Sequence, residues 1–271
     1  MNYSGTVKFA AILVAFLFLG FDAFSQSYQW NLVMSRNAGY THQRWRTRTL
    51  FPSDEIEKGW KENYGITDLT YHNGIWAVVL SRGTGYTHQS CFRKAAFPRE
   101  KIAENWDKGY NITHLTYGNG LWVLVMSKDK NPRKAQMWRS RALFPKEDIS
   151  EFWNKGYDIT DLVYGDGRWV VVMTKGYNYT QSWRLRQNYP ESDIKEFWNK
   201  GYFISHLVYG HGVWALVMSK GTGFTHQWWR LRSTFPESLI HEIWDKGGRI
   251  TCLSQGPYKT ESVPQQIINE D

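Results

Sequence analysis

Five side chains at one recurring position of the sequence are of types that bind metals or transfer protons. They stand third in the segments ITDL, ITHL, ITDL, ISHL and ITCL, 45 to 47 residues apart: Asp68, His114, Asp161, His206 and Cys252. All three residue types are metal ligands, and Asp68 with Asp161 are the candidates for the paired carboxylates of a glycosidase. The alternative is hydrogen bonding inside a tunnel. We favour the alternative and predict no metal, cofactor or catalytic residue, because such sites usually break the symmetry of a repeat.

A second recurring group combines an aromatic ring with hydrogen-bonding side chains. It occurs three times: Tyr40, Thr41, His42, Gln43; Tyr86, Thr87, His88, Gln89; Phe224, Thr225, His226, Gln227. A sugar pocket needs an apolar ring face beside fixed hydrogen-bond partners, so we predict a ligand-binding pocket at each segment. The alternative is that Thr and Gln satisfy the backbone of a turn, because the glutamine is present in all five copies, including Gln136 and Gln181.

Pairs of arginines two residues apart form a third group. They are Arg46 and Arg48, Arg139 and Arg141, Arg184 and Arg186, Arg230 and Arg232. On an outer strand, such charges prevent pairing with the edge of another sheet. The functional alternative is a band of anion-binding sites around the circumference.

All these residues are positioned by an internal repeat of about 46 residues. Three registers keep step over five units: Trp30, Trp76, Trp122, Trp169, Trp214; Trp60, Trp106, Trp153, Trp198, Trp244; and Pro52, Pro98, Pro145, Pro190, Pro236. Each unit begins with an apolar Trp strand and continues through a glycine-rich turn into a second strand. A short helix with proline in its first turn follows. The ITxL strand comes last, and a tight Asn-Gly or Asp-Gly turn joins it to the next Trp strand in most units.

The ends of the repeat predict that the five units close into a ring. The first unit begins at Trp30 without a preceding ITxL strand, and the last unit ends in the ITxL strand Ile250 to Leu253. A ring pairs these two strands, whereas an open solenoid leaves both edges exposed. We therefore predict an all-β fold with short helices: a closed, propeller-like ring of five units, each of about three strands and one short helix.

Three segments carry a resemblance to a known family: VMSRNAGYTHQ, WRTRTLFPSDEI and WNKGYDITDLVYGDGRW. They resemble the repeat domain of unknown function that follows the kinase domain in plant casein-kinase-I-like proteins. The resemblance extends from Trp30 to about Gly256 and implies a shared fold. It does not imply kinase activity, because the sequence has no glycine-rich nucleotide loop, no HRD and no DFG motif.

The first 25 residues have the pattern of a secretory signal. Lys8 precedes the apolar stretch from Phe9 to Phe21, and small residues at Ala23 and Ser25 suit cleavage. We predict a signal peptide at residues 1–25, a repeat domain at residues 26–257 and a disordered polar tail at residues 258–271. No other apolar run is long enough to span a membrane, so the mature chain is predicted to be secreted, extracellular or periplasmic.

The net charge limits the classes of partner, and the cysteine positions bear on disulfide formation. The net charge of +8 favours acidic partners, and export argues against nucleic acid. The two cysteines, Cys91 and Cys252, occupy different positions of the repeat, so we predict unpaired thiols. Together these features predict a monomeric, non-enzymatic binding module for polysaccharides or acidic surface ligands. The alternatives are a protein-binding scaffold and a glycosidase.

Overall fold

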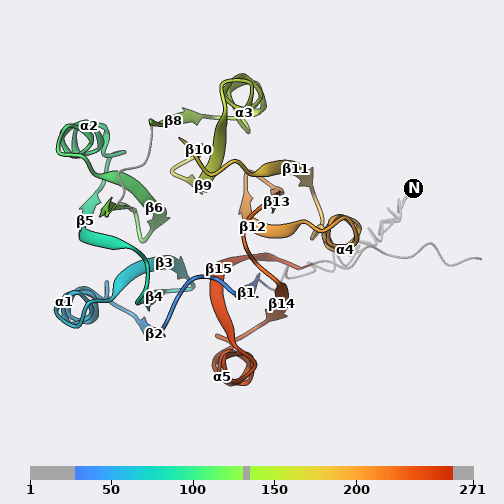
Figure 1. Ribbon diagram of the computed structural model, residues 1–271, viewed down its shortest axis with the longest axis horizontal. Coiled ribbons are helices and arrows are strands. Elements are labelled where there is room, and N and C mark those ends of the chain that lie inside the picture. The colour runs from blue at the N-terminus through green and yellow to red at the C-terminus, as the bar shows by residue number, and fades with distance from the viewer. Residues whose placement is uncertain (1–27, 131–134, 259–271) are drawn as a thin grey trace, which may run out of the picture.

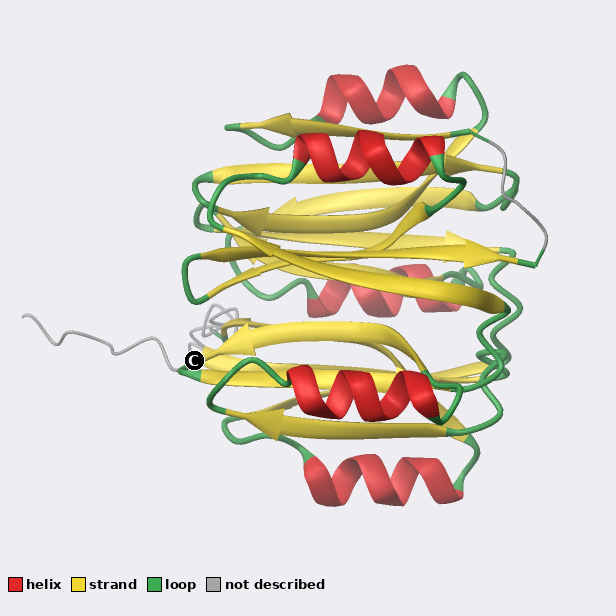
Figure 2. Cartoon of the chain, turned by 90° about the vertical axis from the view of Figure 1, so that its left-hand side faces the viewer, coloured by secondary structure: helices red, strands yellow, loops and turns green. Residues whose placement is uncertain are grey.

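Five three-stranded antiparallel sheets are arranged around a common axis in the computed structural model, which describes residues 28–130 and 135–258 (Figure 1). The predicted signal peptide and nearly all of the predicted tail lie outside the described residues. Figure 2 shows that the strands run along the axis and that the helices lie on the outside. Cys91 and Cys252 are both free thiols, as predicted.

The described chain alternates strands and short helices. In chain order the elements are β1 (Tyr28–Arg36), β2 (Gln43–Arg48), α1 (Ser53–Lys61), β3 (Gly65–His72), β4 (Ile75–Ser81), β5 (Tyr86–Lys94), α2 (Arg99–Asp107), β6 (Asn111–Gly118), β7 (Leu121–Asp129), β8 (Gln136–Arg141), α3 (Lys146–Trp153), β9 (Tyr157–Gly165), β10 (Arg168–Lys175), β11 (Thr180–Arg186), α4 (Glu191–Asn199), β12 (Phe203–Gly210), β13 (Val213–Lys220), β14 (His226–Arg232), α5 (Glu237–Asp245) and β15 (Gly248–Pro257).

Each sheet has a Trp strand in the middle, and we name each sheet by that strand. The orders are β14-β1-β15, β2-β4-β3, β5-β7-β6, β8-β10-β9 and β11-β13-β12. The middle strands are buried along most of their length, which explains their unbroken apolar sequences. The inner strands are the ITxL segments, and they contact one another in the cyclic order β3, β6, β9, β12, β15 and back to β3. Backbone pairing between described strands stays within each sheet, so the five sheets do not merge into one hydrogen-bonded barrel.

The glycine-rich segment after each Trp strand differs from the turn expected within a unit. It carries the chain to the neighbouring sheet: β2 follows β1 in sequence but pairs with β4, with Trp45 opposite Val79. In the folded chain the two edges of β1 pair with β14 and β15, so no edge of β1 is left for β2. We call these connections crossovers.

The β1 sheet joins the two ends of the described chain. In the pairing of β1 with β15, Leu32 lies opposite Leu253 and Val33 opposite Cys252, which confirms the predicted pairing of the first Trp strand with the last ITxL strand. The fifth sheet therefore contains strands separated by almost the whole described chain, while each of the other four is one continuous stretch of sequence.

The helices pack one face against the core. Each begins directly after a proline; the carbonyl of Pro52, for example, accepts a hydrogen bond from the amide of Ile56. The isoleucine of every helix is fully buried, whereas the tryptophan four residues later is only half-buried. Each helix therefore buries its isoleucine fully and its tryptophan only in part. No helix in the described residues is long and apolar enough to cross a membrane.

Candidate functional site

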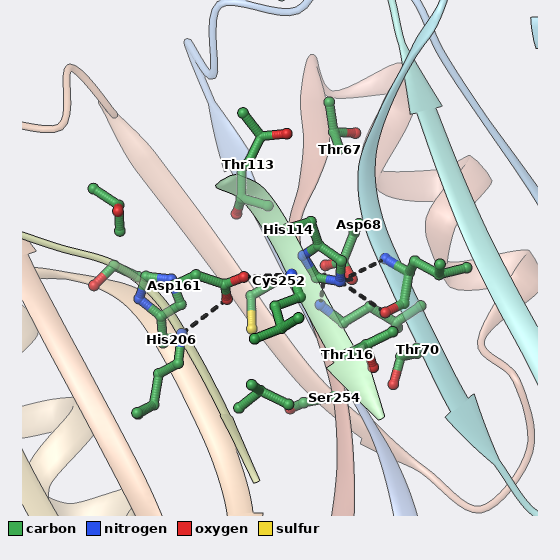
Figure 3. A pocket seen from close by; sticks show the side chains of 18 of the residues that line it. Thr67, Asp68, Thr70, Thr113, His114, Thr116, Asp161, His206, Cys252 and Ser254 are labelled. Carbon is green, nitrogen blue, oxygen red and sulfur yellow. Dashed lines mark hydrogen bonds and ion pairs between the residues drawn. The ribbon is translucent and has the colours of Figure 1, made fainter. Parts of the chain in front are cut away.

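The five inner strands enclose a pocket on the axis of about 490 Å³. The ITxL segments of all five sheets contribute to its wall, which Figure 3 shows from close by. A β-bulge at the second residue of each segment, such as Thr67, interrupts the pairing with the middle strand. The Thr67 hydroxyl bonds to Ser81 Oγ at 2.7 Å, and the bulge brings the third-position side chain to the pocket wall.

The five third-position side chains do lie together in this pocket, as the sequence predicted. Three of them hydrogen-bond to a leucine backbone on the preceding inner strand. Asp68 Oδ2 accepts from the amide of Leu253 at 2.7 Å, and Asp161 Oδ2 accepts from the amide of Leu115 at 2.6 Å. His114 Nε2 lies 2.8 Å from the carbonyl oxygen of Leu69. These bonds join neighbouring sheets, which favours the tunnel hydrogen-bonding interpretation.

Burial dominates the electrostatics of the same side chains. Burial raises the pKa of Asp68 from 3.8 to about 6, although His114, whose Nε2 is 3.9 Å from Asp68 Oδ1, acts in the opposite direction. Burial also lowers the pKa of His206 and raises the pKa of Cys252 to about 12. Within the described residues, no group of three or more His, Cys, Asp and Glu side chains is placed to hold a metal ion.

The glutamine of the aromatic-Thr-His-Gln segments is an internal bridge between sheets. Gln89 Oε1 accepts from the amide of Ile66 at 2.6 Å and from Trp60 Nε1 at 2.9 Å. Gln89 Nε2 donates to the carbonyl of Ile66 and to Ser127 Oγ, both at 3.0 Å. The four equivalent glutamines make the same set of contacts: Gln43, Gln136, Gln181 and Gln227. Their polar atoms therefore serve the fold.

The other residues of these segments separate into two environments. The rings of Tyr40, Tyr86 and Phe224 are half-buried and line the pocket where the crossovers meet it. The threonines and histidines are exposed: Thr41, His42, Thr87, His88, Thr225 and His226. The structure thus brings the three rings to one axial pocket and leaves the three histidines on the surface outside it.

We call the end of the axial pocket where the crossovers meet it the mouth. Sequence reasoning missed two further aromatic residues at this mouth. Tyr177 and Tyr179, in the fourth crossover, also line the pocket, with their ring centroids 5.0 Å apart. That copy lacks the histidine of the motif, and the remaining signal was the pair of tyrosines itself. Four crossovers therefore contribute rings to the mouth; the third contains residues 131–134, which the structure does not describe.

Neighbouring crossovers are tied to one another around the mouth. The amide of Thr41 donates to the carbonyl of Arg82 at 3.0 Å, and the amide of Arg82 donates to the carbonyl of His42 at 2.8 Å. Asn37 Nδ2 donates to the carbonyl of Gly223 at 2.7 Å. These bonds hold the aromatic side chains on a connected frame.

A smaller pocket of about 270 Å³ lies between the β4 and β7 sheets and includes one complete predicted segment. Tyr86, Thr87, His88 and Gln89 line it together with Tyr64 and others. The Tyr64 ring carries the guanidinium carbon of Arg44 at 4.3 Å and that of Arg82 at 4.4 Å from its centroid. Because these two cations already contact that ring, this pocket is a weaker candidate for stacking a sugar than the axial mouth.

At the opposite end of the axial pocket, tyrosines of the lining pack between neighbouring sheets. Tyr71 lies over Gly118 of the next inner strand so closely that a Cβ at Gly118 would be 2.3 Å from Tyr71 Cβ. The same contact joins Tyr117 to Gly165 and Tyr164 to Gly210. These tyrosines therefore seal the sheet junctions, which distinguishes this end from the crossover end.

Comparison with known families finds one family model on this chain. A domain of unknown function, DUF7477, matches at residues 22–119 and again at residues 112–263, so the two matches span all five sheets. No match was found among curated proteins or among solved structures.

Proposed function

Because the chain belongs to the DUF7477 family, which assigns it no activity, we propose its function from the geometry: a secreted, non-enzymatic module that binds glycans at the crossover end of the axial pocket. The observation that carries this proposal is the gathering of aromatic rings from four crossovers at one pocket of about 490 Å³. In this proposal the five sheets act as a closed, propeller-like ring whose axis is the binding site. The resemblance to the repeat domain of plant casein-kinase-I-like proteins does not indicate which ligand is bound.

The chemistry of the mouth suits a sugar. Tyr40, Tyr86 and Phe224 offer apolar ring surface, while Thr84 and Thr222 place hydroxyl groups in the same lining. Sugars combine an apolar face with hydroxyl groups, so both kinds of surface are needed for their recognition. The proposal revises the one-pocket-per-segment prediction to a single axial site with exposed histidines at its periphery.

A glycosidase is the second candidate, because Asp68 has a raised pKa and shares the pocket with Asp161. Against it, both carboxylates already accept backbone hydrogen bonds: Asp161 Oδ1 accepts from Leu162 at 2.8 Å, in addition to the bond from Leu115. A general acid and a nucleophile need their oxygens available to the substrate. Hydrolysis of a bound glycan that Asp68→Asn or Asp161→Asn abolishes, with folding intact, would favour the enzyme.

A glycan array followed by calorimetry tests the proposal. The matched pair is Phe224→Ala, which removes a ring from the pocket, and His226→Ala, which removes an exposed imidazole two residues later. We expect one binding site per molecule, an affinity about tenfold weaker for Phe224→Ala and little change for His226→Ala. Three sites per molecule, lost stepwise on changing His42, His88 and His226, would instead support separate pockets at the three segments.

A further inference from the structure

Of the four arginine pairs on the outer strands, three bind a carboxylate of the following helix and one does not. In the β4, β10 and β13 sheets, each pair shares one carboxylate from the first turn of the following helix. Arg141 Nη2 is 2.8 Å and Arg139 Nε 3.5 Å from Asp148 Oδ1; Arg186 and Arg184 hold Asp193 at 2.8 Å and 3.7 Å. Arg48 and Arg46 hold Glu55 in the same way. Three of the four pairs therefore already bind an internal carboxylate, which argues against a continuous band of unpaired arginines.

The fourth pair, in the β1 sheet, has no such carboxylate. Leu239 stands three residues after Pro236, at the place that Glu55, Asp148 and Asp193 occupy in the other helices. Leu239 is half-buried against the core beside Ile240, so an apolar side chain replaces the anion. Within the described residues, no carboxylate lies within ion-pair distance of Arg230 or Arg232.

The two guanidinium groups nevertheless keep the arrangement that binds a carboxylate in the other sheets. Arg230 Nη1 donates to the carbonyl of Trp229 at 2.8 Å, and Arg232 Nη1 donates to the carbonyl of Leu231 at 2.7 Å. The arginines of the three pairs that bind a carboxylate make the same bond to the preceding residue. Both side chains are exposed, so their remaining donors face solvent in a preorganised pair.

Glu242, an acid whose pKa these arginines influence, forms an ion pair with another residue. Arg230 and Arg232 help to lower the pKa of Glu242, but the main cause is its hydrogen bond with Lys246, at 2.6 Å. The β7 sheet lacks both the arginine pair and its carboxylate. Phe92 and Lys94 replace the arginines, and Lys101 replaces the acid. The β1 sheet differs from every other sheet in having both arginines without the carboxylate.

We propose that Arg230 and Arg232 form a carboxylate-binding site on the outer rim of the β1 sheet, which takes the uronate groups of an acidic polysaccharide. The carboxylate is assigned by the three sheets that bind Glu55, Asp148 and Asp193 with the equivalent pairs; the polysaccharide rests on the proposed function. An exposed contact of this kind is weak alone, so a polymer that repeats the carboxylate is the expected ligand. The site lies on the outside of the ring of sheets, away from the axial pocket.

The decisive variant restores the missing acid. Leu239→Glu places a carboxylate where the helices of the other sheets have one, so it should occupy the pair without removing either arginine. Leu50→Glu is the matched control: it adds the same charge at a residue that is 80% exposed and follows β2 of the β4 sheet, where the arginine pair already binds Glu55. Arg230→Gln with Arg232→Gln is the second variant, because both residues are exposed and their loss leaves no buried charge unpaired.

Calorimetry at low salt with polygalacturonate, its methyl ester and polyglutamate gives the readout. We expect binding of polygalacturonate to weaken at least about tenfold in Leu239→Glu and in the double Gln variant, but not in Leu50→Glu. The ester should bind poorly to every form. Equal weakening by Leu50→Glu and Leu239→Glu, or equal binding of ester and acid, would overturn the proposal. Polyglutamate binding with the same dependence on residue 239, without polygalacturonate binding, would assign the site to an acidic protein instead. Neutral-glycan binding that Phe224→Ala weakens tests the axial site separately.

Discussion

Replacing Gln227 with leucine should destabilise the contact between the β1 sheet and the β13 sheet. Gln227 is 4% exposed; its Oε1 accepts from the amide of Ile204 at 2.8 Å, and its Nε2 donates to the carbonyl of Ile204 at 2.9 Å and to Ser35 Oγ at 3.0 Å. Leucine fills a similar volume but satisfies none of these groups. Two buried backbone groups without a partner cost about 1–3 kcal/mol each, so we expect a loss of about 3–5 kcal/mol in the free energy of unfolding.

Urea denaturation followed by tryptophan fluorescence measures this loss as a shift in the midpoint at constant slope. Gln227→Glu is the control, because its carboxyl group keeps an acceptor for the Ile204 amide. At neutral pH the buried carboxylate is unfavourable, and burial raises its pKa, so this variant should regain stability as the pH falls. An unchanged midpoint in Gln227→Leu would refute the reasoning, because it would mean that water or a rearranged strand replaces the amide without cost.

Three other changes test the fold. Deleting residues 249–271 removes most of β15 and its pairing with β1, so the melting temperature of the whole domain should fall; an unchanged melting temperature would show that this pairing does not stabilise the domain. Trp106→Ala should cost about 3 kcal/mol of unfolding free energy by creating a cavity, and it also removes the hydrogen bond from Trp106 Nε1 to Gln136; an unaltered urea midpoint would show that this helix face is dispensable. Because the pKa of Asp68 is about 6 in the folded chain and 3.8 otherwise, its contribution to stability is lost as the pH rises through 6. The unfolding free energy of the parent chain should therefore rise by about 2 kcal/mol more than that of Asp68→Asn as the pH falls from 7 to 4. Parallel curves of unfolding free energy against pH for the two proteins would contradict the raised pKa of Asp68.

The register of the tryptophans was sufficient to predict the strands, the helices and the terminal pairing. Trp30 and the segment Ile250 to Leu253 are the two halves of one hairpin interrupted by the chain ends, and a repeat read in order reveals this. The destination of each crossover was not predictable in the same way. Local sequence specifies that a turn follows the Trp strand, but the partner of the next strand depends on which distant strands pair with the two edges of the Trp strand in the folded chain.

The candidate site was only partly predictable, because its parts come from different sheets. The sequence shows a glutamine at this position in every copy of the repeat. The partner of Gln89, however, is Ile66, which lies 23 residues earlier and in a neighbouring sheet. The arginine pairs and the acidic first turns of the helices were both visible, but the link from Arg141 to Asp148 depends on the return of the helix along the strand. Tyr177 and Tyr179 were missed because the motif required a histidine that the axial pocket does not use.

The position of β1 has a consequence for the order in which the molecule can assemble. Residues 43–81, 86–129, 136–175 and 180–220 each contain every strand of one sheet, so four sheets can form in turn as the chain emerges during synthesis. The strand made first among the described residues is the one that must wait, since both of its neighbours, β14 and β15, are made last. Through that interval β1 has two unpaired edges of buried, apolar character. We therefore expect one specific misassembly of crowded nascent chains: β1 of one copy inserts between β14 and β15 of another and forms an exchanged dimer that keeps the strand pairing of the β1 sheet.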